Sequence, residues 1–447
     1  MGIESLQQVK DMFRAAGVRT LYVKKLATVQ DNEKNQVFLA KEVADLTALF
    51  PAKLSLRAPS QSELKRKSDV GRPITEATLN FFWMNADGER FHAPGARLID
   101  YFQYPEARLS GFLQGCEWAP RAIRRDEQAD YGQRILVMGS NAAGEVTALL
   151  LTEKDDPVVT GFPELEPSGV SNVLGVLSVE SEAIEAPGEI LADRIRRIIA
   201  DGWHASIRNK AGKLIPFKGN QGGGYTLEAL LGVETNALKE PDILGFEVKS
   251  YRGSKLSLMT PTADGGPEGG LSFRGFMEAY GEPARSGDGS LRYTGVVRAG
   301  RVSTNRGLTL RVTGYDGVSD RFSTDPDEIR VEIYQTASGD VVSSWSLEKL
   351  ADGWNAKHAF AVYVRAEKRE SAETEKDEYR YLAPFLMCQG TDVWRLLRAI
   401  ADGVVYYDPA HSIYANDTAK QRPQWRVSTV GFGETLGRLY RSVKAVS

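Results

Sequence analysis

Residues 241–249 read PDILGFEVK, and this stretch alternates apolar with charged side chains. Such a period of two is typical of a β-strand, so Glu247 and Lys249 are expected on the same face of that strand. Asp242 comes about one strand-length earlier, and its carboxylate can converge with that of Glu247 if the strand is bent or bulged there. The stretch therefore predicts a strand that presents a carboxylate and an ammonium group, with a second carboxylate close by.

Two carboxylates and an ammonium group suit metal-dependent hydrolysis of a phosphoester, because they can hold Mg²⁺ and position an attacking water. Upstream, residues 219–232 read GNQGGGYTLEALLG and place Glu228 in a short helix that we expect to begin at Thr226 and end at Gly232. A carboxylate from this helix could complete a metal shell or hold Lys249 in place. The glycines permit close backbone approach to a partner, which contact with a phosphate requires.

A structural alternative stays open for each of these features. An E-x-K pair on a strand is commonly a solvated face, and a glycine-rich segment before a helix commonly turns the chain. The segment also lacks the GK[ST] ending of a nucleotide-binding loop. What favours a site is the combination of the glycines, the helical Leu-Glu and the spacing of fourteen residues from Glu228 to Asp242.

Length and composition limit the class of protein. A chain of 447 residues exceeds the size at which one core keeps growing, so two or three domains are expected. The net charge of −3 neither favours nor excludes nucleic acid as a partner, because DNA-binding proteins concentrate basic residues in one cleft. The sequence contains no apolar run of about 20 residues and no secretory signal pattern, so a cytoplasmic protein without a membrane partner is expected.

Cysteine and histidine usage argues against two further classes. Cys116 and Cys388 lie far apart in the sequence and do not make a disulfide framework. The four histidines do not have the spacing of zinc ligands. Zinc-dependent hydrolysis is therefore not expected.

The pattern of elements changes along the chain. Residues 1–182 read as mostly β, with hairpins over 77–93 and 134–151 that have Ala-Asp-Gly and Ala-Ala-Gly at their tips. Residues 183–447 alternate helices with strands, which predicts a mixed central sheet flanked by helices. Within them, TPTADGGPEGG at 260–270 is expected to be a mobile loop.

At its Gly-rich turn, Leu-Glu, Pro-Asp and E-x-K, the chain resembles the MvaI/BcnI family of restriction endonucleases, within the PD-(D/E)xK superfamily. The resemblance covers about residues 187–447. It implies that Asp242 and Glu247 ligate Mg²⁺, that Lys249 orients or deprotonates the water, and that Glu228 is the accessory acidic residue. It also implies that Mn²⁺ can replace Mg²⁺, that Ca²⁺ supports binding only, and that hydrolysis leaves 5′-phosphate and 3′-hydroxyl ends.

Base recognition needs further side chains, since phosphate contacts position a protein and base edges specify the site. Residues 406–428 read YYDPAHSIYANDTAKQRPQWRVS and supply the candidates His411, Arg422 and Arg426. Asn220 is a further candidate from the glycine-rich stretch. The alternative for the 406–428 stretch, a surface turn with scattered charges, stays open.

The N-terminal stretch LYVKKLATVQDNEKNQVFLAKEV at 21–43 resembles the first arm of an EcoRII-like effector domain, a B3 pseudobarrel. The resemblance makes Lys24 and Lys25 candidates for DNA contact. In the stretch APRAIRRDEQADYGQR at 119–134, a candidate second arm contributes three arginines, namely Arg121, Arg124 and Arg125. A solvated face is the open alternative for both basic runs.

A B3-like domain joined to an MvaI-like nuclease is the arrangement of a Type IIE restriction enzyme. The resemblance implies a monomer that cleaves double-stranded DNA at a CCWGG-type site, binds a second copy of the site through residues 1–182, and has a DNA methyltransferase as a functional but not physical partner. Two alternatives stay open: a MutH-like repair nickase that needs an activating protein, and a DNA-binding protein without catalysis.

Overall fold

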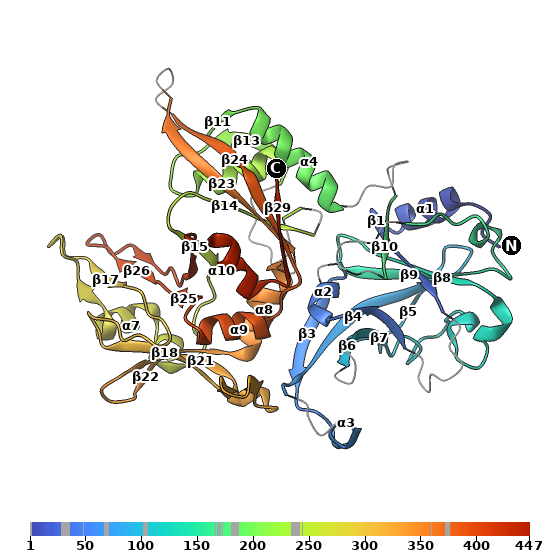
Figure 1. The fold of residues 1–447 in the computed structure, drawn as a ribbon, viewed down its shortest axis with the longest axis horizontal. Helices are drawn as coiled ribbons and strands as arrows, with labels where there is room; N and C mark the ends of the chain where they lie inside the picture. The colour runs from blue at the N-terminus through green and yellow to red at the C-terminus, as the bar shows by residue number, and fades with distance from the viewer. Residues whose placement is uncertain are drawn as a thin grey trace. The chain divides into compact units, whose positions relative to one another are not determined.

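The computed structural model describes the chain (Figure 1) except for residues 1, 28–35, 48, 67–70, 102–105, 166, 168–170, 172, 180–186, 234–241, 244, 359 and 372–375. The contacts divide the chain into two units, of which the first contains Met1–Arg57, Gln61–Ser68 and Ile74–Arg194. The second contains Ala58–Ser60, Asp69–Pro73 and Ile195–Ser447. The predicted boundary near residue 183 lies outside the described residues and stays a prediction.

The first unit is built on one ten-stranded sheet, as the hairpin-rich pattern predicted. Its strands are β1 (Thr20–Leu26), β2 (Val37–Ala40), β3 (Ala52–Arg57), β4 (Ile74–Met84), β5 (Arg90–His92), β6 (Arg97–Tyr101), β7 (Glu106–Ser110), β8 (Arg134–Ser140), β9 (Glu145–Thr152) and β10 (Gly175–Ser178). Its helices are α1 (Leu6–Ala15), α2 (Val43–Thr47), α3 (Gln61–Arg66), η1 (Arg121–Ile123), η2 (Gln128–Tyr131) and η3 (Pro157–Val159). The predicted hairpins are the pairs β4–β5 and β8–β9.

Strand β4 is the reason the sheet curls. Its residues 74–79 pair with β3 and β6, whereas residues 80–84 pair with β9 and β5. The order β10-β1-β8-β9-β4-β6-β7-β2 therefore passes from one part of the sheet to the other through a single long strand, and the sheet forms a curled half-barrel (Figure 1).

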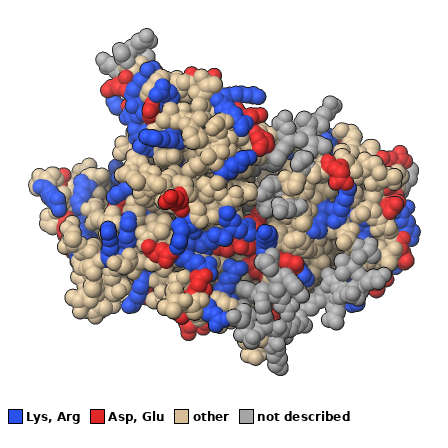
Figure 2. All heavy atoms as spheres, viewed as in Figure 1, with Lys and Arg blue, Asp and Glu red and all other residues tan. Residues whose placement is uncertain are grey.

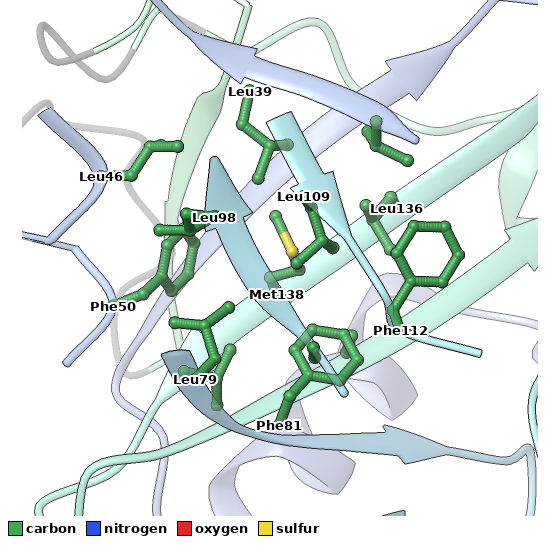
Figure 3. Packing of buried hydrophobic residues seen from close by; sticks show 14 of the residues in the cluster. Leu39, Leu46, Phe50, Leu79, Phe81, Leu98, Leu109, Phe112, Leu136 and Met138 are labelled. Atoms are coloured by element: carbon green, nitrogen blue, oxygen red, sulfur yellow. The ribbon is translucent and has the colours of Figure 1, made fainter. Parts of the chain in front are cut away.

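Both faces of this sheet are buried at β8 and β9, because these two strands carry apolar residues at consecutive positions. In β8, Leu136 and Met138 face the core that Figure 3 shows, together with Leu79, Phe81 and other apolar side chains of the curled part. Ile135 faces the opposite core, which α1 covers.

The second unit contains the mixed central sheet that the sequence predicted, with strand order β11-β24-β23-β14 and β29 paired to β24. Strands β14 and β23 run parallel, and the other pairs are antiparallel. The five strands are β11 (Trp203–Ala205), β14 (Glu247–Tyr251), β23 (Phe360–Glu370), β24 (Asp377–Gln389) and β29 (Ser442–Val446).

Helices cover both faces of this sheet. A Cβ atom on Gly223 of α5 (Gly222–Leu230) would lie 3.3 Å from Ser250 Oγ, whereas the adjacent Tyr251 contacts Phe432 of α10 (Phe432–Leu439) with ring centres 4.7 Å apart. Because neighbouring strand residues point to opposite faces, α5 and α10 lie on opposite sides of β14. The unit's other helices are α6 (Gly266–Gly270), α7 (Phe273–Tyr280), η4 (Pro326–Glu328), α8 (Leu347–His358) and α9 (Val393–Ala401), and α4 (Pro187–Ala200) spans the division between the units.

Smaller sheets complete the second unit. They are β12 (Ile207–Lys210) with β13 (Lys213–Pro216); β15 (Lys255–Met259), β28 (Trp425–Ser428) and β25 (Tyr406–Tyr407); β16 (Glu282–Pro283), β17 (Leu291–Thr294), β26 (Ala410–Ile413) and β27 (Ala419–Lys420); β18 (Leu308–Thr313), β21 (Arg330–Gln335) and β22 (Val341–Ser346); and β19 (Tyr315–Asp316) with β20 (Arg321–Phe322).

The expectation of a mobile loop at 260–270 is wrong. Residues 266–270 form α6, Gly265 and Ser344 pair through backbone hydrogen bonds, and the Trp345 indole donates to Pro261 O at 3.0 Å. Glu268 is buried in this segment. Glycines permit close packing as well as a mobile loop. The composition of the segment alone does not tell which of the two occurs.

Within the parts of the chain that the structure describes, none of the helices combines the length and apolar character needed to cross a membrane.

Candidate functional site

Strand β14 carries the charged pair of the motif on one face. Lys249 Nζ donates to Glu247 Oε1 at 2.7 Å, in agreement with the alternation in the sequence. Only 8% of the Glu247 side chain and 16% of the Lys249 side chain are exposed. The pair is therefore largely removed from water. In such surroundings the loss of one charge is costly, because it leaves the other charge uncompensated.

A tight turn brings Asp242 back to β14. The two end residues of the turn Ile243–Phe246 exchange backbone hydrogen bonds of 3.1 and 2.8 Å, and Gly245 inside it has a φ of +83°, which glycine adopts without strain. Asp242 Oδ2 then accepts a hydrogen bond from Val248 N at 2.8 Å, which places this carboxylate beside the residue that follows Glu247. The approach to the strand comes from a turn before it, and not from a bend or bulge within it.

The oxygen donors at this turn and strand are of the kind that Mg²⁺ binds. Mg²⁺ is usually held by one or two carboxylates together with waters and substrate phosphates, and Asp242 and Glu247 supply two carboxylates. Among the described residues, no three His, Cys, Asp or Glu side chains gather closely enough to hold a metal. The donor set fits Mg²⁺ with water and phosphate as further ligands, and it does not fit a closed zinc site.

Helix α5 lies close to the central sheet because its first turn consists of glycines. A Cβ atom on Gly222 would lie 2.5 Å from the Tyr379 hydroxyl oxygen. One residue on, Gly223 O accepts a hydrogen bond of 2.7 Å from the Tyr381 hydroxyl. In this structure the close approach that the glycines permit is to the protein's own sheet.

Thr226 does not cap this helix, contrary to the expectation. The helix begins at Gly222, four residues earlier, so Thr226 lies inside it. Its Oγ1 accepts from Ile207 N at 3.1 Å and donates to Ile207 O at 3.3 Å. The threonine therefore fixes α5 to β12. Gly232, with a φ of +84°, follows the helix as expected.

Glu228 is half-buried near the end of α5. Burial, followed by the charges of Tyr379 and Glu228, raises the pKa of the Tyr381 hydroxyl well above its usual value, so the Glu228 carboxylate lies within electrostatic reach of that tyrosine. Among the described residues, Glu228 does not join Asp242 and Glu247 in one cluster of metal-binding groups.

A chain of buried hydrogen bonds lies beside the charged pair. Tyr363 on β23 is the register partner of Lys249. Its hydroxyl lies 2.8 Å from the Tyr440 hydroxyl, which in turn lies 3.3 Å from His358 Nδ1. Burial is the main cause that raises the pKa of Tyr363 well above its usual value, and the charge of Glu247 adds to it. These tyrosines remain neutral and give the strand a rigid, uncharged neighbour.

The candidate Arg426 lies on β28 and is oriented by neighbours in the chain. Its Nη1 donates to Asp408 Oδ2 at 3.0 Å and its Nε donates to Ser257 Oγ at 3.1 Å. About a quarter of the side chain, 26%, is exposed. The guanidinium group of Arg426 is therefore already oriented before a partner binds.

Basic side chains gather around Tyr414, and we call Arg292, Tyr414, Lys420 and Arg422 the Tyr414 cluster. The Arg292 guanidinium lies 4.5 Å and Lys420 Nζ 5.3 Å from the centre of the Tyr414 ring. A hydrogen bond from Arg292 and the charges of Lys420, Arg292 and Arg422 lower the pKa of the Tyr414 hydroxyl. Figure 2 shows Lys and Arg side chains at the left of the view, where Figure 1 labels β17 and β26. Sequence reasoning missed Arg292, because it joins the cluster through the pairing of β17 with the distant β26.

The structure corrects the expectation for His411. Its side chain is 0% exposed, so it cannot read base edges directly. Its Nδ1 accepts a hydrogen bond of 2.8 Å from Arg422 N, and Arg422 itself is exposed.

Asn220 is exposed in the turn before α5, where a partner can reach it.

In the first unit, Arg134 ties the two candidate DNA-binding arms together. It is 2% exposed and donates from Nη2 to Ala27 O and from Nη1 to Ala122 O, both at 2.9 Å. Ala27 comes directly after β1 within the first arm, and Ala122 lies in η1 of the second arm. The adjacency of the arms depends on a buried arginine at the end of the second-arm stretch, which was not among the candidates from the sequence.

The cations of the two arms differ in their surroundings. Burial lowers the pKa of Lys24 to about 8, and its Nζ lies 4.9 Å from the centre of the Phe38 ring. Lys25 is exposed and pairs with Glu164. The second arm presents three exposed arginines: Arg121 and Arg124, which lie 3.5 and 4.0 Å from Glu127, and Arg125.

Comparisons with known proteins extend this description. The model of the MvaI/BcnI restriction endonuclease family matches residues 192–433, which is more than half of the chain. Among solved structures, the chain is similar to restriction endonuclease MvaI in complex with its cognate DNA, with 20% sequence identity, a TM-score of 0.45, and coverage of 59% of this chain and 100% of that chain. For MvaI in the absence of DNA the identity is 16%, the TM-score is 0.32, and the coverage is 60% and 100%. No match was found among curated proteins.

Proposed function

The chain belongs to the MvaI/BcnI restriction endonuclease family, and from this premise we propose that it is a Mg²⁺-dependent Type II enzyme that cleaves double-stranded DNA at a specific site. A member of this family is a DNA hydrolase. The observation that carries the proposal is the geometry of β14, where Lys249 bonds to Glu247 and Asp242 bonds to the backbone of the next residue, Val248.

In this proposal Asp242 and Glu247 hold the Mg²⁺, with Mn²⁺ as a substitute and Ca²⁺ as a cation that supports binding only. When bound, the ion polarises the scissile phosphate and lowers the pKa of water. Lys249 orients the attacking water as an ammonium group or, in its neutral amine form, takes the proton of that water. The Glu247 carboxylate holds the lysine side chain in place. Glu228 is the accessory acidic residue on α5. Hydrolysis leaves 5′-phosphate and 3′-hydroxyl ends.

The Tyr414 cluster and Arg426 are the groups that we assign to DNA contact in the second unit, with Asn220 as a further candidate. Arginine is the usual bidentate partner of guanine, and exposed lysines neutralise phosphates. His411 contributes through the backbone of Arg422 and not by direct contact.

The first unit is proposed to be a B3-like effector domain that binds a second copy of the site, which makes the enzyme Type IIE and similar in arrangement to UbaLAI. The curled sheet and the tie that Arg134 makes between the two candidate arms support this assignment. Lys24, Lys25, Arg121, Arg124 and Arg125 would then contact DNA. From the resemblance we propose a CCWGG-type site and a monomer that nicks the two strands in turn. A methyltransferase would protect the site in the bacterial or archaeal cytoplasm.

The test is cleavage of a sequenced plasmid by the purified chain with Mg²⁺, with the ends mapped. Lys249→Ala and Asp242→Ala are expected to abolish cleavage, while specific DNA binding in Ca²⁺ stays largely intact. Lys368→Ala is the matched control, because Lys368 on the neighbouring β23 also forms a 2.7 Å ion pair, with Asp377. Undiminished cutting by either site variant would refute the proposal. Activity that appears only after a second protein is added would instead identify a MutH-like nickase.

A further inference from the structure

A carboxylate and a histidine are buried together beneath the Tyr414 cluster. Glu268 lies on α6 with 1% of its side chain exposed, and His411 lies on β26 with 0% exposed. Glu268 Oε1 and His411 Nε2 are 3.2 Å apart. Burial of such a polar pair is costly unless each group is hydrogen-bonded, so the partners of both residues matter.

The partners of Glu268 all donate to it. Tyr407 OH donates to Oε1 at 3.1 Å, and Ser343 Oγ donates to Oε2 at 2.5 Å. An ionised carboxylate accepts hydrogen bonds only, which matches this set of donors. The two Glu268 oxygens are therefore held from β22 and β25 as well as from β26.

The contacts of His411 define its tautomer. Its Nδ1 accepts a hydrogen bond from Arg422 N, so this nitrogen carries no proton. The proton of the neutral ring then lies on Nε2, which donates to Glu268 Oε1. Phe273 and Tyr293 hold the ring from two sides, with ring centres 5.5 and 5.9 Å from that of His411. Glu268 Oε1 and the Tyr407 hydroxyl, each 3.2 Å from Nε2, thus face the protonated nitrogen, and Nδ1 is left as the acceptor for Arg422 N.

The backbone of Arg422 is fixed on both sides as a result. Its N–H donates to His411 Nδ1 at 2.8 Å, and its carbonyl accepts from Ala410 N at 3.0 Å. The side chains of Arg422 and Lys420 are exposed, and the following Pro423 is buried. The exposed segment is therefore anchored to β26 at the residue whose guanidinium we assign to DNA.

We propose that Glu268 and His411 are positioning residues for DNA-site selection, which fix the backbone of Arg422 so that its side chain meets the DNA in one orientation. This inference rests on the proposed function. An arginine that starts from a fixed backbone loses less conformational freedom on binding than one on a free loop, so its contact contributes more to affinity and discrimination.

Two substitutions of His411 separate positioning from core packing, because each preserves the hydrogen bond of one ring nitrogen and loses the hydrogen bond of the other. In His411→Asn the side-chain oxygen takes the place of Nδ1 and still accepts from Arg422 N. In His411→Gln the amide nitrogen takes the place of Nε2 and still donates to Glu268, but the acceptor for Arg422 is lost. Both remove the buried ring, so a purely structural role predicts the same result for both.

The experiment measures binding in Ca²⁺ to a duplex that carries the plasmid-mapped site and to the same duplex with one base pair changed. His411→Gln is expected to match Arg422→Ala, with a loss of about tenfold in affinity or in discrimination, which corresponds to about one arginine–base contact. His411→Asn is expected to restore most of that loss. Exchange of the Arg422 amide hydrogen in the whole chain is expected to be slow in the wild type and in His411→Asn and fast in His411→Gln.

Three outcomes would overturn the inference: equal losses in the two His411 variants at similar thermal stability, wild-type binding by Arg422→Ala, or fast exchange of the Arg422 amide in the wild type. Fast exchange of the Arg422 amide in the wild type would overturn the inference even if the variants do not fold. Failure of the proposed function is recognised separately, because the wild type would then not cleave the plasmid with Mg²⁺.

Discussion

Replacement of Lys249 by methionine is expected to destabilise the folded protein before any DNA is present. The ammonium group lies 2.7 Å from a Glu247 side chain that is only 8% exposed. Removal of one partner of a buried ion pair costs about 3–5 kcal/mol, and the 16% exposure of Lys249 favours the lower end, about 3 kcal/mol. In a domain of about 150–250 residues each kcal/mol shifts Tm by roughly 2–4 °C, so a decrease of roughly 6–12 °C follows.

Divalent cations should offset part of this loss if Asp242 and Glu247 hold a metal. The variant keeps both carboxylates and lacks the ammonium charge, so Ca²⁺ supplies positive charge where Lys249 no longer does. A ligand that binds only the folded state stabilises it in proportion to the logarithm of its concentration over Kd. Ca²⁺ is therefore expected to raise the Tm of Lys249→Met more than that of the wild type.

Thermal unfolding of the whole chain in EDTA and in a series of Ca²⁺ concentrations measures both effects. Lys368→Met is the matched control, because its ion pair with Asp377 has the same 2.7 Å length on the same sheet but the lysine is 33% exposed. Exposed pairs contribute about 0–1 kcal/mol, so this variant should stay close to the wild type. Equal Tm values for the two variants, or equal Ca²⁺ shifts in Lys249→Met and the wild type, would refute the reasoning.

Two further predictions concern the first unit. Burial lowers the pKa of Lys24 to about 8. The charge of its ammonium group, and with it part of the DNA affinity, should therefore be lost as pH rises through that value. Lys24→Arg should flatten this pH dependence of affinity, measured by anisotropy titrations on either side of pH 8. The unfolded chain has the usual lysine pKa of 10.5 and binds more protons between about pH 8 and 10.5, so the contribution of Lys24 to stability rises across that window. Arg134→Met should release the Ala27 and Ala122 carbonyls at a cost of about 1–3 kcal/mol and speed hydrogen exchange in both arms. Unchanged exchange in both arms would mean that Arg134 does not tie them.

The part of the site that the sequence could predict is the part that forms locally. Alternation within residues 246–249 is enough to put Glu247 and Lys249 on one face, and the structure shows them bonded. Asp242 is only six residues from Val248, so one turn returns it to the strand. The sequence did not reveal that a turn at Gly245 makes this return, since several short conformations bring the ends of such a segment together.

The prediction for His411 was wrong for a reason that lies outside its own segment. A polar residue among aromatics and arginines near the C-terminus resembles a surface residue when only neighbours in sequence are considered. Its burial depends on β17 and α6, which precede it by more than a hundred residues and supply Tyr293 and Glu268. Glu268 was missed as well, because the glycines around it predicted a mobile loop.

The two parts of the proposed catalytic motif therefore depend on different interactions. Asp242, Glu247 and Lys249 are held by hydrogen bonds within a nine-residue stretch, so their arrangement survives as long as β14 stays in the sheet. Glu228 stands on α5, whose position depends on the absence of side chains at its first turn, where a Cβ atom at Gly222 would lie 2.5 Å from Tyr379. The glycines that first suggested a phosphate-binding turn thus act on the proposed site indirectly, because the close packing they allow determines where the Glu228 carboxylate lies.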